Sequence, residues 1–472
     1  MKSVLHLFHD AAKRVPAYKD FLRKNGVRPD KVTTWENFQH IPPVSRANYL
    51  RQYPLEQLCW DGTFQDMSLV FTATSGSTGE PFYFPRNDAI DRQSAMYHEL
   101  FLKNVGTPKA STLVIIAFGM GVWIGGIITY QAFKYLSQKG YSLTILTPGV
   151  NKKEIFAALK HIAPSFGNVI ICAYPPFLKD IIDEGKRQGV DWKKFNLRIV
   201  CAAEAFSEKF RDYIVRKAHL KNPLTDIMNI YGSADIGTMA EESPVSILIR
   251  RMAVANKKLH TALFPLLNRL PTFAQFNPEF IQFEAVNKNI YLTGDSALPL
   301  IRYEIGDHGG VLSYDEVTVI LKKHGIDLAR EARKAGITKT ILKHPFVYIY
   351  ERADLSTKLY GAIIYPEHVK EGISHPSLED SITGKFTMMT KHDPRQNEFL
   401  EINIELKPDV VITESLEKKI GERISTALLE HNAEHRNNAG MMGDRVKPQL
   451  KFWNYEHPEH FRPGIKQKWV KK

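Results

Sequence analysis

Short apolar segments alternate with segments of helical pattern between residues 113 and 200, and this alternation constrains the fold more than any other feature. Strands are predicted at 113–116, 142–146, 169–172 and 197–200, and helices at about 127–138, 152–161 and 177–188. Strands that are apolar throughout are covered on both faces, and strands separated by helices pair in parallel. The pattern predicts an α/β protein with mostly parallel sheets, in which ligands bind at the carboxyl ends of strands.

The chain is too long for one hydrophobic core. It has 472 residues, of which 43% are hydrophobic, and chains of this length usually divide into two or more domains. Beyond residue 352 the pattern changes to a smaller α+β arrangement, with a strand at 400–406 and a helix at 416–430. We therefore predict a large N-terminal domain over 1–352 and a small C-terminal domain over 353–472.

Composition argues against several classes of protein. The three cysteines, Cys59, Cys172 and Cys201, are far apart and odd in number, which disfavours a disulfide framework and favours a reducing cytoplasm. The formal net charge of +12 suits an enzyme of anionic substrates as well as a nucleic-acid binder. No zinc-finger spacing, aromatic-basic motif or long basic run accompanies that charge, so no nucleic-acid partner is expected.

Neither a targeting segment nor a membrane span is expected. Residues 1–10 lack the continuous apolar core and the cleavage site of a secretory signal. Residues 110–133 carry no charge over a length that could cross a bilayer, but Gly119, Gly121, Gly125 and Gly126 interrupt them. We predict that this segment forms a buried strand, a turn and a helix of a covered sheet.

A run of glycines and hydroxyl side chains follows a predicted strand at 70–73. It consists of Ser75, Gly76, Ser77, Thr78 and Gly79, followed by Glu80 and Pro81. The two glycines let backbone amides approach an anion closely, and the three hydroxyls can donate to phosphate oxygens. No lysine follows the second glycine, so this is not the P-loop of kinases and ATPases. The run predicts a phosphate-binding loop, with an ordinary solvated turn as the alternative.

Five further motifs extend this prediction. They are Asn-Ile-Tyr-Gly-Ser-Ala-Asp at 229–235, Leu-Thr-Gly-Asp at 292–295, Pro-Leu-Ile-Arg-Tyr-Glu-Ile-Gly-Asp at 299–307, Glu-Arg-Ala-Asp at 351–354 and Lys-Leu-Tyr-Gly at 358–361. With the glycine-rich run they resemble the adenylate-forming (ANL) superfamily, and most its phenylacetate-CoA ligase-like branch, over most of the chain. The resemblance implies a large adenylation (AMP-binding) domain and a small lid domain.

The same resemblance implies the reaction. A carboxylic acid, with an aryl acid favoured, would be activated by ATP to an acyl-AMP with release of pyrophosphate, and the acyl group would pass to coenzyme A. Mg²⁺ would accompany the ATP. Two alternatives stay open: transfer of the acyl group to a carrier-protein thiol or an amine, and a catalytically degenerate nucleotide-binding protein. The oligomeric state is not predicted.

Nucleotide-binding residues follow from the motifs that match. The resemblance assigns ATP or AMP binding to Ser75, Gly76, Ser77, Thr78, Gly79, Ala203, Glu204, Tyr231, Gly232, Ser233, Arg302 and Asp307. Tyr231 would pack near the adenine, and the Asp307 carboxylate would accept from both ribose hydroxyls. A buried core tyrosine and an aspartate in a turn are the alternatives.

Three positions depart from the family pattern. Asp235 stands where relatives have a glutamate that binds Mg²⁺, and it is one methylene shorter. Glu304 replaces a usual arginine, for which Arg302 could compensate. Glu351 replaces a glycine at the domain junction, where flexibility serves the motion of the lid.

Further residues are assigned at the domain junction and near the C-terminal end. Arg352 would contact ribose or phosphate, and Asp354 would be the hinge about which the lid rotates. Lys466 would reach the carboxylate and the α-phosphate during adenylation, with Lys468 as its competitor and a basic tail as the alternative.

Two more pairs of residues are assigned, one to the access of coenzyme A and one to the binding of the acid. Lys358 and Gly361 would line the path of the thiol, since a glycine lets pantetheine pass close to the backbone. Tyr174 and Phe177 would line the acyl pocket, with aromatic core packing as the alternative. Two basic segments, 247–264 and 316–334, are predicted to be helices with solvated faces.

Overall fold

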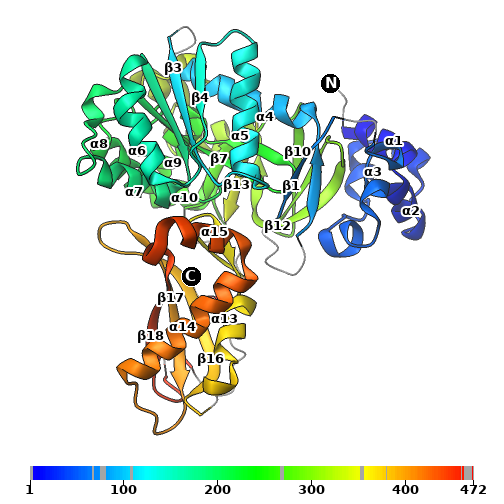
Figure 1. Ribbon diagram of the computed structural model, residues 1–472. Coiled ribbons are helices and arrows are strands. Elements are labelled where there is room, and N and C mark those ends of the chain that lie inside the picture. The colour runs from blue at the N-terminus through cyan, green and yellow to red at the C-terminus, as the bar shows by residue number, and fades with distance from the viewer. Residues whose placement is uncertain are drawn as a thin grey trace.

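The protein forms a large body with a smaller body beneath it (Figure 1). The computed structural model describes residues 4–65, 68–74, 81–106, 110–265, 270–350, 356–378, 380–458, 460–461 and 470. The large body is built on an 11-stranded sheet in the order β10-β11-β12-β13-β9-β8-β7-β6-β5-β3-β4. The predicted α/β class is confirmed.

One half of this sheet is parallel. Its strands are β3 (Thr112–Ala117), β4 (Leu143–Leu146), β5 (Asn168–Ala173), β6 (Leu197–Ala202) and β7 (Ile227–Ser233). The helices of this half are α4 (Asp88–Asn104), α5 (Ile124–Gln138), α6 (Lys152–His161), α7 (Pro175–Gly185) and α8 (Glu208–Lys217). Every residue of β3 and β5 is buried, as their continuous apolar sequence predicts.

The other half of the sheet is antiparallel, which the strand and helix pattern did not predict. It contains β8 (Gly237–Glu241), β9 (Thr272–Gln275), β10 (Ile281–Val286), β11 (Asn289–Gly294), β12 (Leu300–Leu312) and β13 (Phe346–Tyr350). Short turns join several of these strands, and a short turn permits only antiparallel pairing. The turn between β10 and β11 is Asn287-Lys288, and both residues have positive φ, which is the geometry of a tight hairpin.

An N-terminal helical region covers the antiparallel half. It contains α1 (Val4–Arg14), α2 (Pro16–Lys24) and α3 (Trp35–Gln39), at the blue end of the chain in Figure 1. Apolar side chains of this region, among them Phe8, Tyr18 and Tyr49, share one hydrophobic core with residues of β10, β11 and β12. Burial of apolar surface therefore attaches the N-terminal region to the large sheet.

The smaller body contains the C-terminal elements. Its strands are β14 (Thr357–Leu359), β15 (Ala362–Ile364), β16 (Ile382–His392), β17 (Glu398–Leu406) and β18 (Gln449–Trp453), and its helices are α13 (Pro366–Ile373), α14 (Glu414–His431) and α15 (Ala433–Met442). The strand and the helix predicted at 400–406 and 416–430 are parts of β17 and α14. Residues 351–355 lie outside the described part of the chain, so the boundary at 352 stays a prediction.

Each of the two basic segments forms two helices. The first contains α9 (Pro244–Ala255) and α10 (Lys257–Leu263), which meet at Asn256, whose side chain caps α10 by accepting from the amides of Lys258 and Leu259. The second contains α11 (Tyr314–Lys323) and α12 (Leu328–Lys334). Among the described residues, no helix is long and apolar enough to span a membrane, and 110–133 divides into β3 and α5 as predicted.

A buried ion network lies where α8, α9 and the end of β8 meet, and it revises the expectation of a solvated basic face. Arg250 of α9 is 2% exposed and binds Glu208 at 2.7 Å and Glu242 at 3.1 Å. Arg211 of α8 binds the same two carboxylates, at 3.0 and 2.6 Å. Arg250 also donates to the carbonyls of Phe206 and Pro271. Every charge of the network is thus buried with a partner, which is the arrangement that a buried charge requires.

We expect substitution of Arg250 to destabilise the protein far more than substitution of its neighbour. Arg250→Met should lower the free energy of unfolding by about 3–5 kcal/mol, because two buried carboxylates lose a cation. Arg251→Met is the matched control: Arg251 also contacts Glu208, at 3.1 Å, but it is 31% exposed, and its substitution should cost at most about 1 kcal/mol. Urea unfolding of both variants measures the difference, and equal losses would contradict a structural role for the network.

Candidate active site

The predicted phosphate loop lies between two paired strands. β1 (Val70–Ala73) precedes it and pairs with β2 (Tyr83–Arg86), which follows it. The five predicted triphosphate contacts, Ser75, Gly76, Ser77, Thr78 and Gly79, lie outside the described residues and stay predictions. The strand predicted at 70–73 is confirmed.

Arg86, which the motifs did not single out, connects this hairpin to the turn after β7. Its guanidinium is buried, donates to Thr72 of β1 at 2.5 Å and donates to the carbonyl of Ala234. Burial lowers the pKa of Arg86 to about 9, while Asp235 and Asp91 act to raise it, so the side chain is a cation at neutral pH. The hairpin that flanks the loop therefore carries positive charge next to the 229–235 motif.

Tyr231 and Asp307 meet across the sheet. The phenol of Tyr231, on β7, donates to Asp307 Oδ2, on β12, at 2.6 Å. β8, β9 and β13 separate these two strands in the sheet order, so side chains rather than backbone ladders join them. The Tyr231 ring also packs on Phe283, with ring centroids 6.1 Å apart. The residues that the resemblance assigns to adenine and ribose are thus neighbours, as a shared site requires.

Gly232 and Ser233 shape the turn that follows Tyr231. A Cβ on Gly232 would lie 2.9 Å from the carbonyl oxygen of Gly237, closer than side-chain carbons are found, so glycine is required there. The Ser233 hydroxyl accepts from the amide of Asp235 at 3.2 Å. Both residues hold the conformation of the turn, and their predicted contacts with the nucleotide stay predictions.

Asp235 lies in an ion pair that the sequence did not indicate. Arg46, from the N-terminal region, places Nη2 at 2.8 and 3.0 Å from the two carboxylate oxygens and Nε at 3.1 Å from Oδ1. The hydroxyl of Tyr303 donates to the same Oδ1 at 2.9 Å. In this arrangement the carboxylate does not fit a magnesium site, because a guanidinium already neutralises it. The metal role of Asp235 stays a prediction, and a competing role is argued below.

Arg302 lies apart from the group around Tyr231. Its Nε binds Glu284 at 3.0 Å, and Nη1 donates to the carbonyl of Ile41, with the side chain 5% exposed. Glu304 accepts from Asn289 at 3.2 Å rather than from Arg302. Arg302, the cation that could compensate for the arginine missing at position 304, is paired with Glu284, and its predicted contact with ATP stays a prediction.

Ala203 and Glu204, which follow β6, contact the small body. The Lys358 ammonium, on β14, donates to the carbonyl of Ala203, and the Gly361 amide donates to the Glu204 carboxylate. Ala203 has φ +74°, a left-handed conformation that costs a residue with a Cβ roughly 1–2 kcal/mol. Such strain is often found at functional sites, where the surrounding structure maintains it. Two residues predicted for nucleotide binding and two predicted for thiol access are therefore joined directly.

Tyr174 also lies at the junction of the two bodies. A Cβ on Gly361, which has φ +84°, would lie 3.0 Å from the Tyr174 ring, so the ring packs on the bare backbone of the glycine. The Tyr174 hydroxyl accepts from the amide of Gly119 at 3.3 Å. Phe177 is fully buried in the main hydrophobic core. Tyr174 thus lines the junction of the two bodies and Phe177 the core, while a contact of either with the acid stays a prediction.

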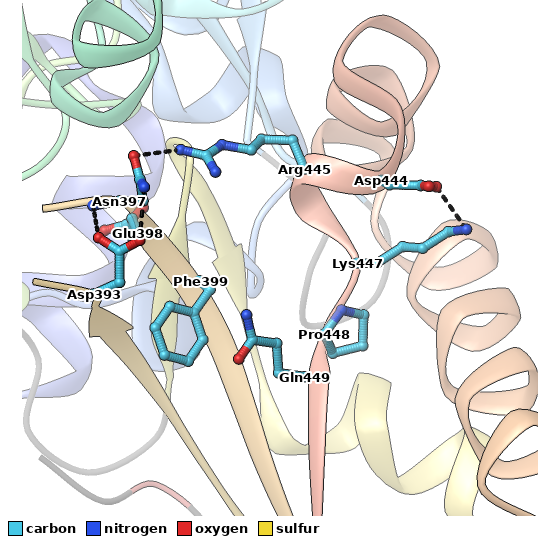
Figure 2. Close-up of a pocket in the computed structure, with 9 residues that line it drawn as sticks. All are labelled: Asp393, Asn397, Glu398, Phe399, Asp444, Arg445, Lys447, Pro448 and Gln449. Carbon is cyan, nitrogen blue, oxygen red and sulfur yellow. Dashed lines mark hydrogen bonds and ion pairs between the residues drawn. The ribbon is translucent and has the colours of Figure 1, made fainter. Parts of the chain in front are cut away.

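An ion pair and a pocket lie beside this junction. Arg445 of the small body binds Asp180 of α7 at 2.8 Å and also donates to Asn397 at 2.9 Å. Figure 2 shows the Arg445 guanidinium directed at Asn397 across a pocket of about 460 Å³. The pocket is lined by Asp393, Asn397, Glu398, Phe399, Asp444, Arg445, Lys447, Pro448 and Gln449. Glu398 accepts from the amide of Tyr360, so the pocket adjoins the 358–361 motif.

Besides the five residues of the predicted phosphate loop, four assigned residues lie outside the part of the chain that the structure describes. They are Arg352, Asp354, Lys466 and Lys468. Their predicted roles in catalysis and as the hinge stay predictions. Among the described residues, sequence reasoning missed Arg46, Arg86 and Glu434, because a lone charged residue outside a motif carries no local signal of the partner that tertiary contacts give it.

Comparison with known proteins places this geometry in a class. No family model matches the chain. Phenylacetate-coenzyme A ligases of Aromatoleum evansii and Pseudomonas putida are each 23% identical over 229 residues, 48% of this chain and 48% of theirs. That of Thermus thermophilus is 22% identical over 233 residues. The chain spans about half the length of the curated relatives it matches.

Solved structures match over nearly the whole chain. 2-Hydroxyisobutyryl-CoA ligase in complex with 2-HIB-AMP and CoA, in the thioesterification state, has a TM-score of 0.64 at 14% identity, covering 99% of this chain and 88% of that one. Its open conformation has a TM-score of 0.54, and a postadenylation state has 0.52. The chain therefore has the fold of the adenylate-forming ligases. Within that class, the sequence comparison confirms the resemblance to the phenylacetate-CoA ligase-like branch.

We expect contact between the two bodies to weaken as pH rises towards 8. Burial, reinforced by Glu204 and opposed by Lys358, raises the pKa of Glu434, at the start of α15, to about 8. The docked form therefore keeps a proton that the undocked form loses near the ordinary pKa of 4.5. Docking is favoured most below that pH and loses this contribution progressively until about pH 8.

Energy transfer between dyes on the two bodies, measured from pH 5 to 9, tests this expectation. Glu434→Gln should flatten the profile, since glutamine does not titrate. Glu430→Gln is the matched control, because Glu430 is exposed one turn earlier on α14 and its loss should leave the profile unchanged. An unchanged profile in Glu434→Gln would assign the pH dependence to another group.

Proposed function

We propose that the protein activates a carboxylic acid with ATP, forming an acyl-AMP and pyrophosphate, and then transfers the acyl group to coenzyme A. The observation that carries the proposal is the 2.6 Å contact between Tyr231 and Asp307, the residues expected at adenine and ribose, within a fold of this class. An aryl acid is the favoured substrate, in line with relatives named phenylacetate-coenzyme A ligase.

The first half-reaction needs positive charge and amide donors around the triphosphate. A carboxylate attacks the α-phosphorus while negative charge develops on the pyrophosphate leaving group, so catalysis depends on positioning and electrostatic stabilisation. Arg86, a buried cation on the strand after the glycine-rich loop, supports this requirement. We propose that the loop amides, Arg352 and Lys466 complete the set.

Coenzyme A is the proposed acceptor in the second half-reaction. The TM-score is higher against the thioesterification state of the neighbouring ligase than against its open and postadenylation states, which supports reading the present arrangement of the two bodies as thioester-forming. We propose that the thiol passes along the junction of the two bodies, between Glu204, Lys358 and Gly361, and that Tyr174 lines this path. Delivery to a carrier-protein thiol or an amine is the alternative.

Magnesium and location are part of the proposal. Mg²⁺ is expected to accompany ATP and to offset phosphate charge when bound. We propose a cytoplasmic enzyme, and the buried, free thiols of Cys59, Cys172 and Cys201 are compatible with a reducing compartment.

Pyrophosphate release tests the proposal. With ATP, Mg²⁺ and a panel of aryl and fatty acids, we expect release that depends on the acid, and formation of an acyl-CoA when coenzyme A is present. Asp307→Ala should raise the KM for ATP about tenfold or more, because hydrogen bonds to a carboxylate are lost. Release without a thioester would favour a protein or amine acceptor. If ATP binds but no acid of the panel causes pyrophosphate release, a degenerate nucleotide-binding protein would be favoured.

The two C-terminal lysines can be separated by single substitutions. Lys466→Ala should slow acid-dependent pyrophosphate release about a hundredfold, because removal of one charge-stabilising donor commonly costs that much in rate. Thioester formation from supplied acyl-AMP should change little. Lys468→Ala is the matched control, and a reversal of the two effects would assign adenylation to Lys468.

A further inference from the structure

We infer that Asp235 is a positioning residue, which holds Arg46 and Tyr303 and thereby fixes the ends of β7 and β12 that face the nucleotide, rather than a ligand of magnesium. The inference rests on the proposed function in one respect, since the site that it positions is the proposed ATP site. Three observations support it: the geometry of the ion pair, the two contacts across the sheet and the anchoring of Arg46.

The ion pair itself has the geometry of a strong, lasting contact. Two guanidinium nitrogens of Arg46 reach both oxygens of Asp235, at 2.8 to 3.1 Å, and the Asp235 side chain is 3% exposed. A two-pronged pair of this kind is among the strongest of hydrogen-bonded contacts. A divalent cation on the same oxygens would lie a few ångströms from the guanidinium and be repelled by it. In the described ranges, no three His, Cys, Asp or Glu residues are grouped so as to hold a metal.

Two side-chain hydrogen bonds join residues 231–235 to β12. Tyr231 donates to Asp307, and Tyr303 donates to Asp235. The second contact lies four residues further along the first segment and four residues back along the second. Because three other strands separate β7 from β12 in the sheet, side-chain hydrogen bonds rather than a backbone ladder join the two segments. Fixing Asp235 against Tyr303 therefore also fixes Tyr231 against Asp307.

Arg46 is held in place by the backbone before it. The amide of Val44 donates to the carbonyl of Arg302 at 3.2 Å, and the amide of Glu304 donates to the carbonyl of Val44 at 2.8 Å. These bonds flank Tyr303 and place the chain beside β12. Two residues later a helical turn, Arg46–Leu50, begins behind the cap formed by Ser45 and Asn48. The guanidinium thus projects from a fixed point, and through it the N-terminal region contacts the proposed ATP site.

The two charges of a buried ion pair depend on each other, so the effects of substituting them are not independent. Removing one partner leaves a buried charge without compensation, whereas removing both leaves two neutral groups that can still hydrogen-bond. The loss from the double substitution should therefore be no larger than the greater single loss. A metal ligand behaves differently, because its removal changes the effect of Mg²⁺ whether or not Arg46 is present.

The test is a cycle of ATP dissociation constants, measured by calorimetry in EDTA and in saturating MgCl₂. The proteins are wild type, Arg46→Gln, Asp235→Asn, the double variant and Arg46→Lys. Arg198→Gln is the matched control, since Arg198 pairs with Asp226 at 3.2 Å, with the side chains 9% and 3% exposed, at the opposite ends of β6 and β7. Unfolding midpoints of all six are measured without nucleotide.

We expect each single variant to weaken ATP binding about tenfold to a hundredfold, as a small misplacement of binding groups does. The double variant should be no weaker than the worse single one, Arg46→Lys should recover part of the loss, and Arg198→Gln should lower the unfolding midpoint without changing ATP affinity. The ratio of affinities with and without Mg²⁺ should be the same in wild type and Asp235→Asn.

Two results would overturn the inference. If Asp235→Asn abolishes the effect of Mg²⁺ while Arg46→Gln retains it, Asp235 is a metal ligand. If the two single losses add in the double variant, the residues do not act as a unit. Where a single variant fails to fold, the charge-balanced double variant carries the Mg²⁺ comparison. If wild type binds no ATP, the proposed function fails, and the unfolding midpoints alone decide the inference, with additive decreases counting against it.

Discussion

The change from parallel to antiparallel pairing at β7 is the constraint on which the site depends. β7, which contains Tyr231, is the last parallel strand, the turn after it contains Asp235, and three strands separate β7 from β12 in the sheet. Backbone hydrogen bonds cannot join strands that are not neighbours, so side chains must join them. The contacts Tyr231–Asp307 and Asp235–Tyr303 do so, and both predicted nucleotide motifs owe their proximity to these contacts.

Several arginines bind acceptors within the fold. Arg46, Arg86, Arg211, Arg250 and Arg302 each bind carboxylates, hydroxyls or carbonyls in the interior or at the edge of the site. Some of the 63 basic residues are therefore structural rather than available to a surface partner. Their planar, multi-donor guanidinium groups suit this use, since one side chain can satisfy several acceptors drawn from different elements.

The junction of the two bodies has a different character from the core. It combines hydrogen bonds from Lys358 and Gly361, the Asp180–Arg445 ion pair and the packing of Tyr174 on Gly361. Polar contacts of this kind can be exchanged for contacts with water at little net cost, which is compatible with the proposed motion of the small body between half-reactions. The titration of Glu434 adds a dependence on pH to the same junction.

The sequence by itself determined the class of the fold and the elements that carry the motifs. Continuous apolar runs and glycine punctuation are local signals, so β1, β3, β5, α6, β17 and α14 were predictable within a few residues. The family resemblance also assigned Tyr231 and Asp307 to one nucleotide site, and the structure joins their side chains. Only the tertiary structure decided that half of the sheet is antiparallel, that Arg250 is buried and that Arg46 holds Asp235. The ion pairs of Arg250 and Arg46 join residues 8 to 189 positions apart in the chain, and the energy of a buried charge is set by such partners rather than by its neighbours in sequence.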